Sequence, residues 1–360
     1  MTPGHRARQP SSRGDGHPLV ARREHLPDAP LPGSGPLPDG DSALGRRKHS
    51  PHWQRGAFRN IDEVRRRFRA LNFLKWRLTD RRARIPRRLV SGAPHVAPDT
   101  ARLHQQGFEG ITWLGHATAL IQLGGMNILT DPLWGNPVGY PCRLVPQAMA
   151  IADLPPIHAV LISHNHLDHL DARTLRKIGQ GPVYAVPLGV ERFIRRRRLR
   201  YAVGFDWWEW HELGPLRITF VPSHHWSQRG LTWNRSLWGG WIIESPTTTV
   251  YYSGDTARTP ILDEIGRRFP HIDYAILSTG SYEPRWYMKT VHMNPEEAVD
   301  TFVTLGARHL IPVHWGTLRL GAEPPGEAPI LLERQFARLG LPATALHVLA
   351  IGETLAIAPA

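Results

Sequence analysis

Residues 163–169 read SHNHLDH, which gathers three histidines and an aspartate within six positions. The apolar run IHAVLIS leads into this stretch and predicts a buried strand, and the pattern that follows it is helical. The cluster is therefore expected on a strand-to-helix loop, where binding groups often collect. The first two histidines lie two positions apart and can point the same way from extended backbone, while the aspartate and last histidine turn elsewhere. One short loop could thus bind two metal ions.

Three further strands end in side chains that could complete such a site. LRITFVPSHHW ends in His224 and His225, TTVYYSGDT in Asp255 and RHLIPVHWG in His314. We assign one metal ion to His164, His166 and His225, the other to Asp168, His169 and His314, and a bridging position to Asp255. From the residues alone, His224 could exchange roles with its neighbour. Such a ligand set leaves a shared position for water, as a catalytic site requires.

The donor atoms indicate the metal and its chemistry. Imidazole and carboxylate donors without thiolates fit Zn²⁺ best and also permit Fe, Mn or Co. The lone cysteine, Cys142, excludes an internal disulfide and a thiolate-rich cluster. Two Zn²⁺ ions would lower the pKa of a shared water to roughly 7 and hold the oxygens of a group under attack. The sequence therefore predicts a hydrolase with two Zn²⁺ ions.

The positive charge of the chain is concentrated in its N-terminal part. Of the net charge of +13, residues 1–110 contribute 22 Lys and Arg against 10 Asp and Glu, whereas residues 111–360 hold 22 against 21. No stretch approaches the roughly 20 apolar residues that span a bilayer. The polar, proline-rich start also lacks the apolar core of a secretory signal. We expect a cytoplasmic protein, with an organelle transit peptide as the alternative.

The chain divides into three expected parts. Residues 1–55 are rich in Pro, Gly and Arg and are expected to be disordered, because they bury too little apolar surface to offset ordering. Residues 56–109 form a basic amphipathic extension, whose apolar face could pack on the main domain or contact a membrane surface or an acidic partner. Residues 110–360 alternate strands with helices and predict a layered α/β domain.

The pattern of the main domain predicts particular elements. Two strands should meet at Gly124 and Gly125, and further strands are expected at 157–163, 216–222, 248–253, 273–278 and 308–313. One helix should start near Asp171, and another at Asn294 with its end at Gly306. The final stretch, TALHVLAIGETLAIA, should form a pair of strands that closes the edge of a sheet.

These residues resemble the metallo-β-lactamase superfamily, whose four-layer αββα sandwich carries a dinuclear zinc site on the motif His-x-His-x-Asp-His. The resemblance covers roughly residues 110 to 345 and is strongest to the N-acyl-phosphatidylethanolamine-hydrolysing phospholipase D group. It rests on the order and spacing of TWLGHAT (112–118), LTDPLW (129–134), HW followed by LWGGW (225–241), SGDT (253–256), VHMNPEEAV (291–299) and HWGT (314–317). It implies the metal ligands assigned above and selects His225 over His224.

The resemblance also implies catalytic roles. Asp131 looks like the family aspartate that lies beside the site and orients a ligand histidine, although it could be a turn residue before Pro132. His292 looks like the family histidine that faces the phosphate, where it could donate a proton or a hydrogen bond, although it could simply be a polar residue where a helix begins. With Asp168 these are the candidate catalytic residues. His116 is shared with the family, and its role stays open.

The function that the resemblance implies is that of a zinc phosphodiesterase of phospholipase D type. It would cleave N-acyl-phosphatidylethanolamine to N-acylethanolamine and phosphatidic acid through a metal-bridging hydroxide. The expected partners are the phospholipid and an anionic membrane surface held by the basic extension, and nucleic acid is not expected. A lactonase or another hydrolase of soluble substrates is the alternative, and a nuclease fits the nearly neutral main domain less well. Four tryptophans could line an acyl groove, meet a bilayer or pack in the core: Trp226, Trp233, Trp238 and Trp241.

Overall fold

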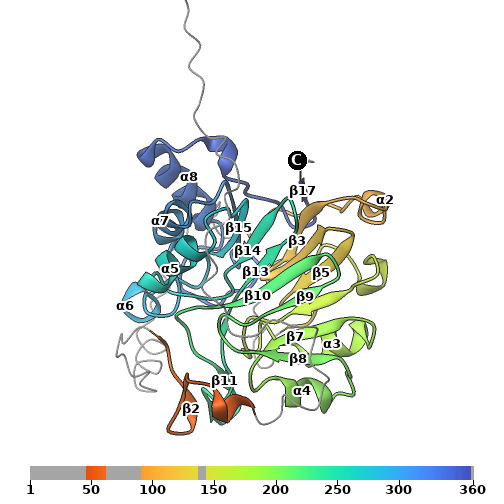
Figure 1. The fold of residues 1–360 in the computed structure, drawn as a ribbon. Coiled ribbons are helices and arrows are strands. Elements are labelled where there is room, and N and C mark those ends of the chain that lie inside the picture. The colour runs from red at the N-terminus through yellow and green to blue at the C-terminus, as the bar shows by residue number, and fades with distance from the viewer. Residues whose placement is uncertain (1–45, 62–90, 137–142, 358–360) are drawn as a thin grey trace, which may run out of the picture. The chain divides into compact units, whose positions relative to one another are not determined.

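Two β-sheets form the centre of the main domain (Figure 1). The computed structural model describes residues 46–61, 91–136 and 143–357, which fall within one compact unit, Pro32–Ala360. One sheet consists, in spatial order, of β17 (Thr354–Ala356), β3 (Gly110–Gly115), β4 (Thr118–Leu123), β5 (Met126–Thr130), β6 (Ala159–Leu161), β7 (Val183–Pro187) and β8 (Ala202–Phe205). The other consists of β16 (His309–Val313), β15 (Tyr274–Ser278), β14 (Thr249–Tyr252), β13 (Gly239–Glu244), β10 (Leu216–Pro222) and β9 (Trp210–Leu213).

The two sheets share one hydrophobic core. Trp113 and Leu161 from the first sheet and Phe220 and Trp241 from the second are fully buried in the same cluster. Nearly continuous apolar runs form these strands, because strands in sheets that are covered on both faces have few solvent-facing positions. The sequence therefore specifies a sandwich rather than a sheet with one solvent-exposed face.

Helices cover the outer face of each sheet (Figure 1). On the second sheet these are α5 (Pro260–Arg268), α7 (Pro295–Leu305) and α8 (Glu327–Leu339), which pack in a second cluster with strand residues such as Leu277. Beside the first sheet lie α2 (Thr100–Leu103), α3 (Ala172–Ile178) and α4 (Glu191–Arg195). The layers confirm the expected αββα sandwich for the part of the chain that the structure describes.

The helix boundaries that frame the site are confirmed. Asn294 caps α7: its side chain accepts from the amide of Glu297, whose carboxylate accepts from the amide of Asn294. Gly306 ends this helix in the left-handed conformation. Asp171 caps α3 by accepting from the amides of Arg173 and Thr174. The metal loop, residues 163–169, is thereby fixed between a buried strand and a capped helix.

The turn between two strands at Gly124 and Gly125 is confirmed, but the expected number of two strands between residues 110 and 130 is wrong. The segment forms three strands, β3, β4 and β5, because the chain also turns back at His116 and Ala117. Neither residue is a typical turn former, so the pattern gave no signal there. The expected strands at 157–163, 216–222, 248–253, 273–278 and 308–313 are confirmed within a few residues. Of the expected final pair, one strand forms within the described residues, β17, and it closes a sheet edge.

Residues 46–61 are folded, although we expected disorder as far as residue 55. They form η2 (Arg46–His49), β1 (Trp53–Gln54) and β2 (Ala57–Phe58), and Phe58 is fully buried in the main core. Composition misled here, because two aromatic rings, Trp53 and Phe58, are enough to dock this short segment. Residues 1–45 and the amphipathic stretch at 62–90 lie outside the described residues, and the domain boundaries stay predictions.

Candidate metal centre

The candidate metal ligands and His116 leave from one edge of the sandwich. His116 lies in the turn between β3 and β4, residues 164–169 follow β6, His225 follows β10, Asp255 follows β14 and His314 follows β16. Because β14, β15 and β16 run parallel and β10 runs in the same direction, their carboxyl ends reach the same edge. All seven proposed ligands are brought together there.

His164, His166 and His225 make up what we call the first ligand group. The His166 Nδ1 atom lies 2.8 Å from His164 Nε2 and 3.3 Å from His225 Nε2. Two nitrogens bound to one tetrahedral Zn²⁺ are separated by roughly 3.3 Å, given Zn–N bonds of about 2.0–2.1 Å. The spacing therefore fits three donors to a single ion.

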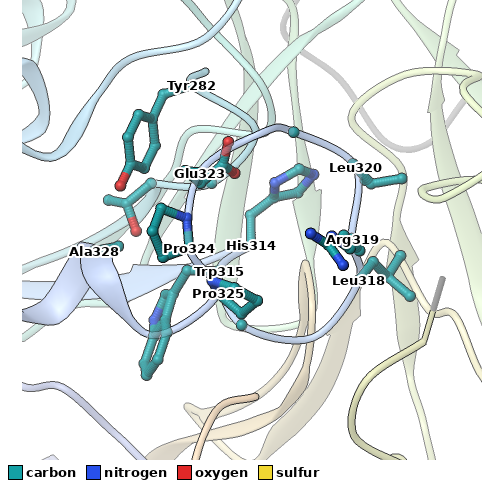
Figure 2. Close-up of a pocket in the computed structure, with 14 residues that line it drawn as sticks. Tyr282, His314, Trp315, Leu318, Arg319, Leu320, Glu323, Pro324, Pro325 and Ala328 are labelled. Carbon is teal, nitrogen blue, oxygen red and sulfur yellow. The ribbon is translucent and has the colours of Figure 1, made fainter. Parts of the chain in front are cut away.

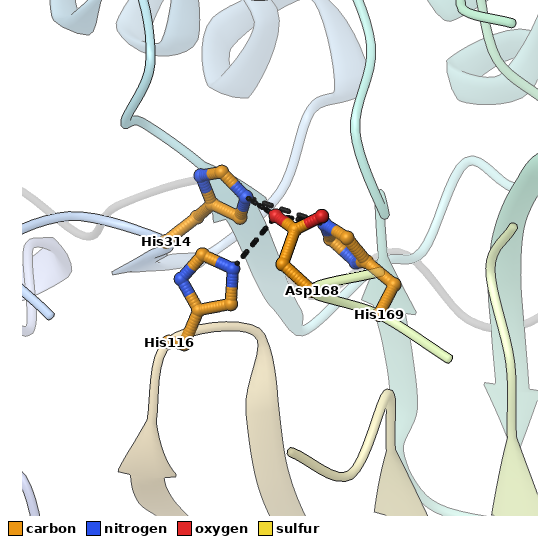
Figure 3. Close-up of side chains that lie close together, drawn as sticks. All are labelled: His116, Asp168, His169 and His314. Atoms are coloured by element: carbon orange, nitrogen blue, oxygen red, sulfur yellow. Dashed lines mark hydrogen bonds and ion pairs between the residues drawn. The ribbon is translucent and has the colours of Figure 1, made fainter. Parts of the chain in front are cut away.

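Asp168, His169 and His314 make up the second ligand group (Figure 3). The two Nε2 atoms lie 3.2 Å apart, and the Oδ2 atom of Asp168 lies 3.4 Å from His169 and 3.5 Å from His314. This spacing again fits the donors of one ion.

Asp255 lies between the two groups. Its Oδ2 atom is 3.1 Å from His169 Nε2 and its Oδ1 atom is 3.4 Å from His314 Nε2. The same Oδ2 atom lies 3.9 Å from the Nε2 atoms of both His164 and His225. One carboxylate thus contacts both groups, which is the arrangement that a bridging ligand needs.

Hydrogen bonds fix which ring nitrogen of three of these histidines, His164, His169 and His225, faces the centre. His225 donates from Nδ1 to the carbonyl of Val291 at 2.9 Å, which leaves the Nε2 lone pair for a metal. His164 Nδ1 lies 2.9 Å from the hydroxyl of Ser163. His169 Nδ1 lies 2.7 Å from Asp131 Oδ2. Metal ligands commonly have such partners behind them.

Asp131 is fully buried directly behind the second ligand group. Besides its contact with His169, it accepts from the amide of Ser163 at 2.7 Å and from the hydroxyl of Tyr252 at 2.6 Å. The side chain therefore contacts a ligand histidine, as the resemblance implied, rather than serving only a turn.

His116 and His292 flank the ligands. The His116 Nε2 atom lies 3.1 Å from Asp168 Oδ2, and its ring packs 4.0 Å from that of His314 (Figure 3). Since it reaches the carboxylate of a ligand, it can hold Asp168 in place. The His292 Nδ1 atom lies 3.9 Å from Asp255 Oδ2. His224 is also buried but belongs to neither ligand group.

Three of these residues have backbone conformations that side chains disfavour. The φ angles of His116, Asp131 and His314 are 54°, 33° and 68°, in the left-handed region. Such conformations cost free energy and persist only where the surroundings hold them. Of the eight non-glycine residues with positive φ in the described part of the chain, these three lie at one edge of the sandwich, which supports a functional site there.

The histidines of the first ligand group are neutral at pH 7 in the metal-free protein. Burial lowers the pKa of His164 well below its usual value and lowers those of His166 and His225 to about 3. Neighbouring imidazoles lower the pKa of His164 and His166 further. These nitrogens can therefore accept a metal without first losing a proton.

The second ligand group is charged. Burial alone would raise the pKa of Asp168 and Asp255, but the surrounding histidines hold both well below the usual range. Burial would lower the pKa of His169, yet Asp255, Asp168 and Asp131 raise it well above its usual value. This histidine must release its proton when a metal binds.

Sequence reasoning missed Asn60, which fixes the backbone of a ligand. Its Nδ2 donates to the carbonyl of His225 at 3.0 Å, and its Oδ1 accepts from the amide of His225 at 3.3 Å and from Trp238 Nε1 at 2.8 Å. Tyr252 behind Asp131 and Ser278, which donates to Asp255 at 2.9 Å, were missed as well. Among the residues that support the ligands, only Ser163 could have been suspected from the sequence, because it directly precedes the motif.

The four tryptophans divide into two pairs. Trp238 and Trp241 are buried in the core. Trp226 and Trp233 stack at 4.4 Å and are half-buried, and Trp226 also lies 4.3 Å from the ring of His166. In the second pair Trp226 contacts the ring of a candidate ligand directly, whereas Trp238 acts on the site through Asn60.

A small cavity of about 10 Å³ lies behind His314 (Figure 2). Glu323 lines it and accepts from the amides of Ser281 at 2.6 Å and Glu283 at 3.1 Å. This volume suits about one water molecule, so the cavity is not the place where a substrate binds. Its walls instead support the loop behind the second ligand group.

Comparison with known proteins identifies the class. The family model described as Beta-lactamase superfamily domain matches residues 126–315. An uncharacterised protein of Mycobacterium tuberculosis is 35% identical over 295 residues, which are 78% of each chain. A metal-dependent hydrolase of Pyrobaculum aerophilum is 30% identical over 222 residues, 60% of this chain and 88% of that one. The chain belongs to the beta-lactamase superfamily, and it is a metal-dependent hydrolase whose His/Asp cluster is able to bind metals.

Two further comparisons refine the class. An N-acyl-phosphatidylethanolamine-hydrolyzing phospholipase D of Caenorhabditis elegans is 35% identical over 229 residues, which are 58% of this chain and 64% of that protein. The crystal structure of a possible metal-dependent hydrolase from Veillonella parvula has a TM-score of 0.59 at 18% identity and covers 70% of this chain and 100% of that one. The structural likeness shows the fold.

Proposed function

We propose that the protein is a dinuclear zinc phosphodiesterase of phospholipase D type that acts on N-acyl-phosphatidylethanolamine. The observation that carries this proposal is the pair of ligand groups with Asp255 between them. Two adjoining metal ions suit the attack on a phosphodiester, because they can contact both the attacking and the leaving oxygen. The named activity of the nematode relative supports the choice of lipid.

Two zinc ions held by these groups would supply a water that ionises near neutral pH and positive charge for the phosphate oxygens. The protein's own residues prepare their ligands. His225 keeps its Nε2 lone pair toward the centre because its Nδ1 donates to Val291. Asp131 does the same for His169 by accepting from its Nδ1 atom. A ligand that is held in this way loses little freedom when the metal binds.

His292 has the best position to contact the substrate. Its ring lies 5.2 Å from that of His225, and its Nδ1 atom lies 3.9 Å from Asp255, so it faces the space between the groups. In the reaction, water oxygen bonds to phosphorus, the bond from phosphorus to the N-acylethanolamine oxygen breaks, and that oxygen takes up a proton. An imidazole N–H of His292 would donate a hydrogen bond to the phosphate or to the leaving oxygen.

Release of N-acylethanolamine from labelled lipid tests the proposal. We expect the zinc-loaded protein to release it and a chelator or Asp168→Asn to abolish the release. The matched control is Asp153→Asn, an exposed carboxylate that belongs to neither ligand group, which should leave turnover unchanged. Turnover that survives both the chelator and Asp168→Asn would reject the proposal. Hydrolysis of a soluble lactone without any turnover of the lipid would favour the alternative hydrolase.

A further inference from the structure

A short hairpin near the metal centre ends in an exposed leucine. The strands β11 (Gln228–Arg229) and β12 (Thr232–Trp233) are joined by Gly230 and Leu231, and the Leu231 side chain is fully exposed. Tight turns of this kind usually carry small or polar residues. Leu167, within the metal loop itself, is also an exposed leucine.

The hairpin is attached to the metal loop. Arg229 donates from Nη1 to the carbonyl of Asn165, which lies between two ligands of the first group. At the base of the hairpin, the stacked pair of Trp226 and Trp233 rests on the ring of His166. The hairpin that carries Leu231 thus contacts the loop that carries Leu167, and we treat the two exposed leucines as one surface.

Arginines surround this surface. The guanidinium carbons of Arg197 and Arg229 lie 3.2 Å and 4.4 Å from the centre of one ring, that of Phe193. Along α4 and just beyond it, further exposed arginines follow in the run RRRRLR, and α3 adds Arg176. Within the described ranges, no carboxylate lies at ion-pair distance from Arg197 or Arg229. Arg176, Arg192 and Arg196 are exposed, so their positive charge is accessible to an anion from outside.

We propose that this surface binds a bilayer that contains anionic phospholipid. Leu231 enters the interface between head groups and acyl chains, and the arginines of α3 and α4 bind lipid phosphates. A bilayer can bury the exposed leucine and bind the arginines at the same time. A soluble anion would contact only the arginines, so the combination favours a lipid surface. The inference rests on the proposed function, because it would bring the lipid substrate to the metal loop.

Co-sedimentation of the full chain with vesicles tests this surface without relying on catalysis. We expect binding to vesicles of phosphatidylcholine mixed with phosphatidylglycerol and much weaker binding to phosphatidylcholine alone. Leu231→Glu should weaken binding roughly tenfold, since it removes the burial of a leucine. Arg192→Gln combined with Arg196→Gln should weaken it by a similar factor at low salt and by less at high salt.

Matched controls lie on the opposite face of the sandwich. Val303→Glu changes an exposed apolar residue of α7, and Arg267→Gln combined with Arg308→Gln removes two exposed charges, so both should bind as the wild type does. Equal binding of Leu231→Glu and wild type would overturn the proposal, and so would a wild type that ignores anionic vesicles. Turnover of a soluble phosphodiester such as bis-p-nitrophenyl phosphate should be the same in Leu231→Glu and wild type. If the wild-type protein binds anionic vesicles but does not hydrolyse the lipid, the proposed function is rejected and the proposed membrane surface is not.

Discussion

The two ligand groups are similar in geometry but are supported differently. Behind the second group lies a buried carboxylate, Asp131, which contacts His169. The first group has uncharged direct partners, the carbonyl of Val291 and the hydroxyl of Ser163, which in turn donates to Asp131. A carboxylate behind a ligand histidine raises its basicity and strengthens the metal bond. We therefore expect the second group to bind its metal more tightly, and the following experiments examine that difference.

Removal of the shared carboxylate should have the largest effect. Asp255→Ala takes a donor from both groups, so both metal affinities should fall by more than the roughly 10- to 100-fold that loss of an outer partner costs. Hydrolysis should fall to background. Titration with Co²⁺, followed by its absorbance, reports both sites. Full affinity retained at one site would show that Asp255 serves a single group.

Replacement of the carboxylate behind His169 should separate the two groups. Asp131→Asn should weaken the second group by roughly 10- to 100-fold and the first group less, because Asp131 contacts His169 directly but reaches His164 only through the hydroxyl of Ser163. The same Co²⁺ titration should then change from two overlapping steps to two well-separated ones. If both steps weaken equally, Asp131 supports the fold of the site rather than one metal.

The two groups should also respond differently to pH. The pKa of His169 is raised, so a metal must displace its proton, and the affinity of the second group should rise up to about tenfold per pH unit until that pKa is passed. His166 and His225 have pKa values of about 3 and carry no proton to displace. First-group affinity should therefore stay nearly flat between about pH 5 and pH 8. Metal titrations over this pH range, with proton release measured in weakly buffered solution, check this difference. If the metal affinities of both groups change equally with pH, the prediction is wrong.

The smallest effect is expected from the residue that fixes the backbone of His225. Asn60→Ala removes the hydrogen bonds to the amide and the carbonyl of His225, each worth about 1 kcal/mol. The metal affinity of the first group should therefore drop by about fivefold. The matched control is Asn127→Ala, on the far end of β5, which loses hydrogen bonds of the same kind away from the ligands. Weakening confined to the second group would contradict the assignment.

The sequence predicted the site best where a candidate ligand directly follows a segment with a strong strand pattern. His225, Asp255 and His314 each follow an apolar strand, and parallel strand directions bring such ends together. The same reasoning could not find Asn60, which lies 165 positions from His225, or Tyr252, which lies 121 from Asp131. Contacts over such distances depend on packing that no local pattern encodes. The turn at His116 was missed because its residues do not favour turns.

The left-handed backbone at His116, Asp131 and His314 has an evolutionary consequence. Each of these residues costs the fold about 1 kcal/mol or more, which glycine at the same position would recover. Selection for stability alone would thus favour glycine or asparagine at these positions. Only the need for a metal ligand, or for a residue that holds a ligand in place, opposes that selection. Descendants of this fold that have abandoned metal chemistry should be recognisable by small residues at these three turns, even where the surrounding strands are unchanged.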